Sequence, residues 1–241
     1  SKSSSLYRWW TVAWYKRQRG VLPRMEQNLR RLTENKSIIL VGNSVEMLQH
    51  DLADYIESFD TVVRFGNGIP TSDNWDSIGK RTDIWITGFL RYKKKRFFPK
   101  DIPVLFNRSR IHLDRIPHHY PNYEVIEMFS DKELFEIFDL VGAKNGEPDG
   151  QRPSAGFVAI QYFLQKVKYS SLTLVGFDFF SKSLSITAGA CNPYSWHLPQ
   201  NTQEYNPHAK VEKELVLGYE RSGKLQWKVL SDLSQGSLDL S

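Results

Sequence analysis

Histidines are the side chains of this chain best suited to acid–base chemistry. His208 stands near the start of a predicted helix over residues 207–219. A neutral imidazole can take a proton from a hydroxyl group near neutral pH, so a histidine there is a candidate general base, or else a surface or capping residue. No cluster of Cys and His has the spacing of a zinc site. The single cysteine, Cys191, lies in a polar stretch where a thiol is more often incidental than nucleophilic.

Two predicted strands run into turns that could hold a phosphate or a nucleotide. Residues 37–41 lead into the turn at residues 42–44, which reads Gly-Asn-Ser, and residues 171–175 lead into Gly176. Where such a turn opens a helix, free backbone N–H groups point outward and attract anions. The first turn has neither the Gly-x-Gly-x-x-Gly dinucleotide fingerprint nor the lysine of a P-loop. By itself it also fits a plain strand–helix turn with a capping side chain.

Strands and helices alternate along the chain from residue 37 onward. Continuous apolar runs are typical of parallel strands buried on both faces, and apolar residues at helical spacing indicate helices. The predicted strands cover residues 37–41, 60–65, 83–87, 104–107, 124–128, 171–175 and 227–230, and the predicted helices cover residues 25–32, 45–56, 131–138, 154–166 and 207–219. This order predicts a single Rossmann-like α/β domain with a mainly parallel sheet. We expect residues 38–41 and 172–175 to be neighbouring central strands, with ligands bound beyond their carboxyl ends.

Residues 1–36 differ from the rest of the chain in charge. They hold nine Lys or Arg and two Glu, a charge of +7 within a total of +5, so residues 37–241 carry −2. Trp9, Trp10 and Trp14 recur near helical spacing between the cations, as in a helix that lies in a membrane interface. We therefore divide the chain into a leader, residues 1–36, and a main domain, residues 37–241. The leader either associates with a membrane surface or packs on the main domain.

Composition favours a globular protein and argues against several other classes. Of the 241 residues, 40% are hydrophobic and 24% charged, which separates the chain from disordered proteins. The main domain is acidic and has no DNA- or RNA-binding motif, so we expect no nucleic-acid partner. One cysteine allows no internal disulfide, which favours a reducing compartment. We expect a cytoplasmic protein, peripheral to the inner face of the membrane, or a Golgi-lumenal one if an N-terminal anchor has been removed.

Several segments, read together, resemble the sialylmotifs of the sialyltransferases. Their order and spacing agree with the family pattern over residues 37–230, in segments 38–44, 60–64 and 79–83 for the long motif, segments 152–156 and 172–178 for the short motif, and His208 with Glu212 and Glu214 for the final motif. The resemblance implies a sialyltransferase-type variant of the GT-A fold. It also implies an inverting enzyme that moves sialic acid from CMP-sialic acid to a hydroxyl group of an oligosaccharide or glycolipid.

The resemblance also assigns roles to particular residues. His208 would be the general base, and His197, which ends a Tyr-Ser-Trp-His segment, would assist catalysis by contacting the leaving phosphate. The donor carries one phosphate, so neither a metal ion nor a cofactor is implied. The implied donor-binding residues are Gly42, Asn43, Ser44, Asn67, Arg152, Ser154, Ala155, Gly156, Gly176, Phe177, Asp178 and Tyr194.

The chain departs from the family pattern at several positions. Ser37 stands where animal members have a cysteine, which favours the bacterial-type members. Lys213 occupies the usual place of the acid in the final motif, Asn67 is displaced by one residue, and Phe179 and Phe180 stand near where bacterial members have a tyrosine. Two alternatives therefore stay open. One is a transferase for another CMP-activated ulosonic acid such as Kdo, and the other is a non-catalytic nucleotide- or membrane-binding module.

Overall fold

Two strands form the centre of the sheet, β1 (Ser37–Val41) and β6 (Ser171–Val175). They pair in parallel, with Ile38 opposite Leu172. In both strands every residue after the first is buried, so neither shows the alternation of a half-exposed strand. The computed structural model describes residues 23–66, 68–70, 72–87, 102–106, 125–143, 152–179 and 207–230.

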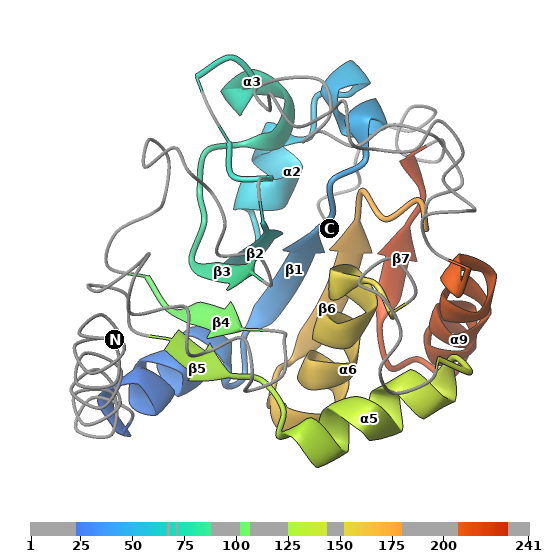
Figure 1. Ribbon diagram of the computed structural model, residues 1–241. Helices are drawn as coiled ribbons and strands as arrows, with labels where there is room; N and C mark the ends of the chain where they lie inside the picture. The colour runs from blue at the N-terminus through green and yellow to red at the C-terminus, as the bar shows by residue number, and fades with distance from the viewer. Residues whose placement is uncertain are drawn as a thin grey trace, which may run out of the picture.

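Within these residues, seven strands form one all-parallel sheet in the order β5-β4-β3-β2-β1-β6-β7 (Figure 1). The other strands are β2 (Thr61–Phe65), β3 (Ile84–Thr87), β4 (Val104–Phe106), β5 (Val125–Glu127) and β7 (Gln226–Lys228). The chain builds outward from β1 to β5, then returns to the other side of β1 to add β6 and β7. Such a reversal opens a crevice at the carboxyl ends of the two central strands. The parallel sheet and the central pair predicted from the sequence are both confirmed.

Alternate residues of the central strands face two different layers of helices. Ile38 and Leu40 share a core with the layer formed by a helix over residues 23–33, α5 (Asp131–Leu140), α6 (Ala155–Lys166) and α9 (Ala209–Arg221). Ile39 and Val41 share a second core with the layer formed by the 3-10 helix η1 (Val45–Gln49), α2 (Ala53–Glu57) and α3 (Trp75–Ile78). The period-two alternation of strand side chains produces this division. Both faces of the sheet are therefore covered.

The segment over residues 45–56 is not the single helix that the sequence pattern predicted. It consists of η1 and α2, separated at His50, whose backbone is extended with φ −125° and ψ 150°. Leu52 is buried, and its N–H donates a hydrogen bond of 2.8 Å to the carbonyl of Ser77 in α3. This tertiary contact fixes the chain direction at the break, and local helical spacing carries no information about it.

The helix over residues 23–33 belongs to the packed body of the protein. Met25 and Leu29 are only 2% and 7% exposed and join the core on the α6 face. The hydroxyl of Thr61, at the start of β2, donates to the carbonyl of Leu32. The tryptophan-rich part of the predicted leader, residues 1–22, lies outside the described residues, so its membrane association stays a prediction. In the described ranges no helix is both long enough and apolar enough to cross a membrane.

Hydrogen bonds to two carboxylates, those of Asp60 and Asp83, hold together the amino ends of β1, β2 and β3. Asp60 accepts hydrogen bonds from the backbone N–H and the hydroxyl of Ser37, at 2.9 and 2.8 Å, and these bonds lower the pKa of the Asp60 carboxyl. Asp83 accepts from the backbone N–H of Val62 at 2.8 Å and from Nε of Arg81 at 2.9 Å. Each carboxylate thus joins the start of one strand to its neighbour.

Arg64 connects β2 to the segment that leads into β3. Its side chain is fully buried, and it donates to the carbonyls of Arg81 at 2.9 Å and Ile78 at 2.6 Å. Burial lowers the pKa of Arg64 to about 9. We call the set Asp60, Arg64, Arg81 and Asp83 the charged scaffold. Its members come from the segments that resemble the long sialylmotif, and their contacts hold strands together.

Candidate functional site

The turns after β1 and β6 are packed directly against each other. The N–H of Gly42 donates to the carbonyl of Val175 at 2.8 Å, and the N–H of Ser44 donates to the carbonyl of Gly176 at 3.1 Å. A Cβ atom on Gly42 would lie 2.2 Å from the carbonyl oxygen of Gly176, which leaves no room for a side chain. Gly176 itself has φ +69°, a conformation that favours glycine. We call these two turns, residues 42–44 and 176–178, the strand-end turns.

The first strand-end turn carries two buried polar atoms that have no hydrogen-bond partner in the described structure, Asn43 Oδ1 and Ser44 Oγ. The amide nitrogen of Asn43 donates to the carbonyl of Phe65, at the end of β2, at 3.3 Å. A Cβ atom on Gly68 would lie 1.9 Å from Asn43 Oδ1, so the chain after β2 packs closely over this side chain. Unpartnered buried polar atoms cost free energy, and a ligand that forms hydrogen bonds with them would remove that cost.

The start of α6 reaches the second strand-end turn. A Cβ atom on Gly156 would lie 2.8 Å from the ring of Phe177, so glycine is needed for that ring to lie against the helix. Phe177 in turn packs edge-on against Phe65 with ring centroids 5.7 Å apart. The hydroxyl of Ser154 accepts a hydrogen bond from the N–H of Phe157 at 3.0 Å and so caps α6. Three predicted donor-binding segments therefore meet at one edge of the sheet.

Glu212 ties the start of α9 to the start of α6. Its side chain is fully buried, and its carboxylate accepts from the backbone N–H and the hydroxyl of Ser154 at 2.7 and 2.6 Å. The sequence placed Glu212 in the final motif but gave no reason to expect this contact, because its partner lies 58 residues away. The available signal was the four-residue step from His208, which puts both side chains on one face of a helix. Glu214 is exposed.

His208 is half-buried at the N-terminus of α9, close to the end of α5. Its Nδ1 lies 3.0 Å from the carbonyl oxygen of Val141, the residue that follows α5. A carbonyl oxygen only accepts hydrogen bonds, so Nδ1 carries the hydrogen in this contact and the basic nitrogen of the neutral ring is Nε2. Because α6 and α9 each precede a parallel strand, both helices start at the carboxyl edge of the sheet. His208 and the strand-end turns therefore share that edge.

The remaining predicted site residues fall into two groups. Arg152 and Asp178 are half-buried at the same edge, and Ala155 is exposed in the first turn of α6. Phe179, which follows Asp178, is buried with φ +48°, a rare conformation for a side chain of this size and a local strain next to the candidate site. The other predicted residues lie outside the described residues, and they are Asn67, Tyr194 and His197.

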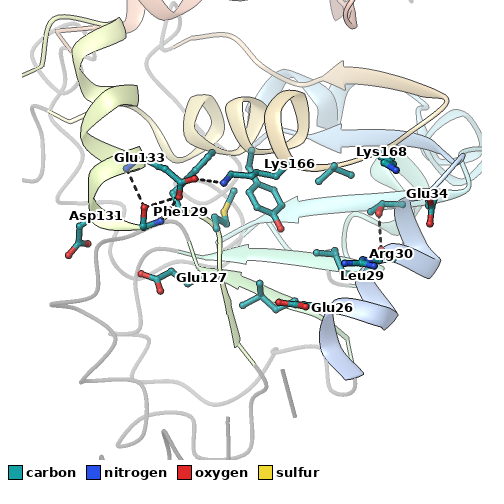
Figure 2. Close-up of a pocket in the computed structure, with 16 residues that line it drawn as sticks. Glu26, Leu29, Arg30, Glu34, Glu127, Phe129, Asp131, Glu133, Lys166 and Lys168 are labelled. Carbon is teal, nitrogen blue, oxygen red and sulfur yellow. Dashed lines mark hydrogen bonds and ion pairs between the residues drawn. The ribbon is translucent and has the colours of Figure 1, made fainter. Parts of the chain in front are cut away.

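A cavity of about 750 Å³ lies elsewhere in the fold (Figure 2). It is bounded by the helix over residues 23–33, the residues after β5, the start of α5 and the end of α6. Charged side chains of both signs surround it, and Glu133 is hydrogen-bonded to Ser130 and Lys166 at its border. Burial raises the pKa of Tyr162, in its wall, to about 12. None of the predicted site residues lines this cavity.

No metal site is evident in the part of the chain that the structure describes, where no three His, Cys, Asp or Glu side chains are grouped closely enough to hold an ion. The acids at the starts of β2 and β3 bond to backbone and arginine donors instead. What the described edge does offer is an imidazole, several backbone turns and polar side chains. Such groups can bind a nucleotide and move a proton.

Comparisons with known proteins identify the fold. No protein-family model and no curated protein matches this sequence. Among solved structures, a mammalian sialyltransferase in complex with Gal-beta-1-3GalNAc-ortho-nitrophenol matches with a TM-score of 0.52 and 15% identity, over 90% of this chain and 85% of that one. A further mammalian sialyltransferase structure matches with a TM-score of 0.54 and 14% identity, over 90% and 84%. The protein is thus a single α/β domain with the sialyltransferase fold.

Proposed function

We propose that this protein is an inverting glycosyltransferase that moves sialic acid from CMP-sialic acid onto a hydroxyl group of an oligosaccharide or glycolipid. The observation that carries the proposal is that a candidate base and a candidate nucleotide-binding turn lie at the same carboxyl edge of a sheet with the sialyltransferase fold. There an imidazole with a fixed Nδ1 hydrogen stands on the same edge as a turn with two unpartnered polar atoms. Its likeness to bacterial-type members, suggested by Ser37, stays a prediction, because the matching structures named above are mammalian.

In this proposal the strand-end turns hold the CMP part of the donor. Backbone N–H groups at the start of α6 and the Ser44 hydroxyl donate to the phosphate, and Oδ1 of Asn43 accepts from a ribose hydroxyl. Nε2 of His208 takes the proton of the acceptor hydroxyl as its oxygen attacks the anomeric carbon. The bond from that carbon to the phosphate oxygen breaks, CMP leaves with the electron pair, and the configuration inverts. His197 and Tyr194 are the proposed donors to the departing phosphate.

A donor screen tests the proposal directly. CMP-Neu5Ac and CMP-Kdo are each incubated with the protein, with and without Gal-β-1-3GalNAc, the disaccharide named with one matching structure, and CMP release is measured. We expect release from CMP-Neu5Ac that depends on the acceptor and that His208→Ala abolishes. Release from CMP-Kdo but not from CMP-Neu5Ac would show that the donor sugar is Kdo. CMP binding without turnover on a panel of glycan acceptors would favour the binding-module alternative.

The proposal includes catalysis without a metal ion. A donor with a single phosphate has no diphosphate for a metal to bridge, so the leaving group can be stabilised by hydrogen bonds from the protein alone. We expect CMP release to continue in EDTA at an unchanged rate. A rate that falls in EDTA and recovers with Mg²⁺ or Mn²⁺ would show that a metal takes part.

A further inference from the structure

Glu212 is a charged side chain in a position that packing alone would give to an apolar residue. The buried side chains of α9 among those described are Glu212 and Val216, one helical turn apart. Val216 belongs to the hydrophobic core, while Glu212 is fully buried on the same face. Burying a carboxylate costs free energy that its hydrogen bonds only offset, and a well-packed apolar residue is often as stable or more so. The contacts of Glu212 therefore call for an explanation other than stability.

The contacts of Glu212 form a short path between the candidate base and the donor-side turns. On one side, its backbone N–H donates to the carbonyl of His208 at 2.9 Å, within the first turn of α9. On the other side, its carboxylate binds Ser154 twice, and the Ser154 hydroxyl caps α6 through Phe157. Two residues further along α6, Gly156 lies against Phe177 of the second strand-end turn.

From these contacts we propose that Glu212 is a positioning residue, which fixes the distance and angle between the imidazole of His208 and the donor held by the strand-end turns. The proposal rests on the function proposed above. Two hydrogen bonds from adjacent atoms of one residue fix direction as well as distance, which apolar packing at this position would not do. The contact between His208 Nδ1 and the Val141 carbonyl adds a second fixed point, from α5. The ring is thus fixed by a contact from the end of α5, and the first turn of α9, which carries the ring, is tied to the start of α6.

The test replaces Glu212 with a residue that packs but cannot make the hydrogen bonds. For Glu212→Leu we expect a modestly lowered melting temperature, because the Ser154 N–H loses its acceptor. Well below that temperature, kcat should be lowered by about 10²-fold and the KM for the CMP-sugar should stay within about twofold, because small displacements of reacting groups carry costs of this size. Glu212→Gln keeps the volume and one acceptor oxygen, so it should recover part of the lost kcat. Glu136→Leu, at an exposed position of α5, is the matched control and should change none of these three quantities.

A second measurement separates positioning from base chemistry. In Glu212→Leu the fall of the rate at acid pH should persist, since His208 is still the base, whereas His208→Ala should remove it. Combining Glu212→Leu with Ser154→Ala should lower kcat little further than Glu212→Leu alone, because Glu212→Leu already removes both bonds to Ser154, whereas the lost cap of α6 should lower the melting temperature. An unchanged kcat in a stably folded Glu212→Leu would overturn the proposal. So would a kcat that falls only at temperatures where Glu212→Leu unfolds.

A third measurement needs no turnover at all. Nitrogen-15 NMR of the His208 ring should show the Nδ1–H tautomer in the wild type and in Glu136→Leu, and a mixture of tautomers in Glu212→Leu. If no CMP-sugar is consumed by the wild type but the tautomer changes as expected, the proposed function fails while the positioning contact stands. A tautomer unaffected by Glu212→Leu would overturn the positioning role whatever the activity.

Discussion

The first strand-end turn and the charged scaffold both come from the segments that resemble the long sialylmotif, but they are built in opposite ways. In the scaffold, charged side chains bond across neighbouring strands to backbone N–H and carbonyl groups, to the Ser37 hydroxyl and to each other, although Nη1 of Arg64 has no partner in the described structure. In the turns, glycines bring backbones together, and two side-chain atoms of adjacent residues are left without partners. The segments that resemble the long motif therefore supply both contacts that hold strands together and a turn with unpartnered polar atoms.

The largest expected effect is on kcat and leaves CMP affinity unchanged. His208→Ala should lower kcat by about 10²-fold or more, since a positioned base contributes roughly 10²–10⁴. CMP affinity, measured by calorimetry, should stay the same, because the base faces the acceptor and not the nucleotide. His50→Ala, at a half-buried histidine beside η1, is the control and should leave kcat unchanged. Near-normal turnover without His208 would move the base to another residue, with His197 the first to test.

The next effect concerns the charged scaffold, where a substitution should lower the free energy of unfolding. Arg64→Met leaves the buried carbonyls of Ile78 and Gly79 without their donor, which we expect to cost about 2–3 kcal/mol of unfolding free energy. Urea unfolding measures this cost, and activity per folded molecule should not change. Arg31→Met, at an exposed position, serves as the control. A loss of CMP affinity with unchanged stability would place Arg64 in the binding site and break the comparison between the two regions.

The third prediction is the reverse of the second, because donor binding should weaken while stability is kept. Asn43→Ala removes a half-buried amide whose buried oxygen has no partner in the described structure, so the melting temperature should stay equal or rise. The KM for the CMP-sugar should increase about tenfold, which corresponds to one lost hydrogen bond of about 1.4 kcal/mol. Asn28→Ala, in the helix over residues 23–33, is the control. A strong loss of stability in Asn43→Ala would make this residue part of the scaffold.

The smallest effect lies at the border of the cavity, away from both regions. The hydrogen bond from Lys166, with others from Ser130, lowers the pKa of Glu133 to about 2. A carboxylate with a lowered pKa stabilises the folded state above its unfolded value of 4.5, and that contribution is lost as pH falls toward 2. Glu133→Gln should therefore reduce stability at pH 7 by less than about 1 kcal/mol, because the pair is partly exposed. Unfolding curves at pH 7 and pH 2.5 should show the difference shrinking.

Strand pattern predicted more of this molecule than helix pattern did. The apolar runs at residues 38–41 and 172–175 predicted two buried central strands, because burial on both faces demands such runs. The break at His50 and the short helix α3 escaped prediction, since the hydrogen bond between Leu52 and Ser77 that accompanies them is tertiary. The turn glycines were found in sequence as candidates, but the contact between Gly42 and Gly176 was not. The hydrogen bond between Glu212 and Ser154 could not be predicted for the same reason, because it joins residues far apart in the sequence.

The pairing of β1 with β6 has a consequence for the order in which the protein folds. On one side of β1, Ile38 pairs with Thr61 of β2, which closes a short loop. On the other side, Ser37 pairs with Ser171 of β6, which closes a very long loop. Long loops close late because their entropy is lost before any contact compensates for it. We expect β1, β2 and β3 to assemble first, while the ribosome is still adding later residues. The strand-end turns would then meet near the end of folding, and the chain would gain its binding site last.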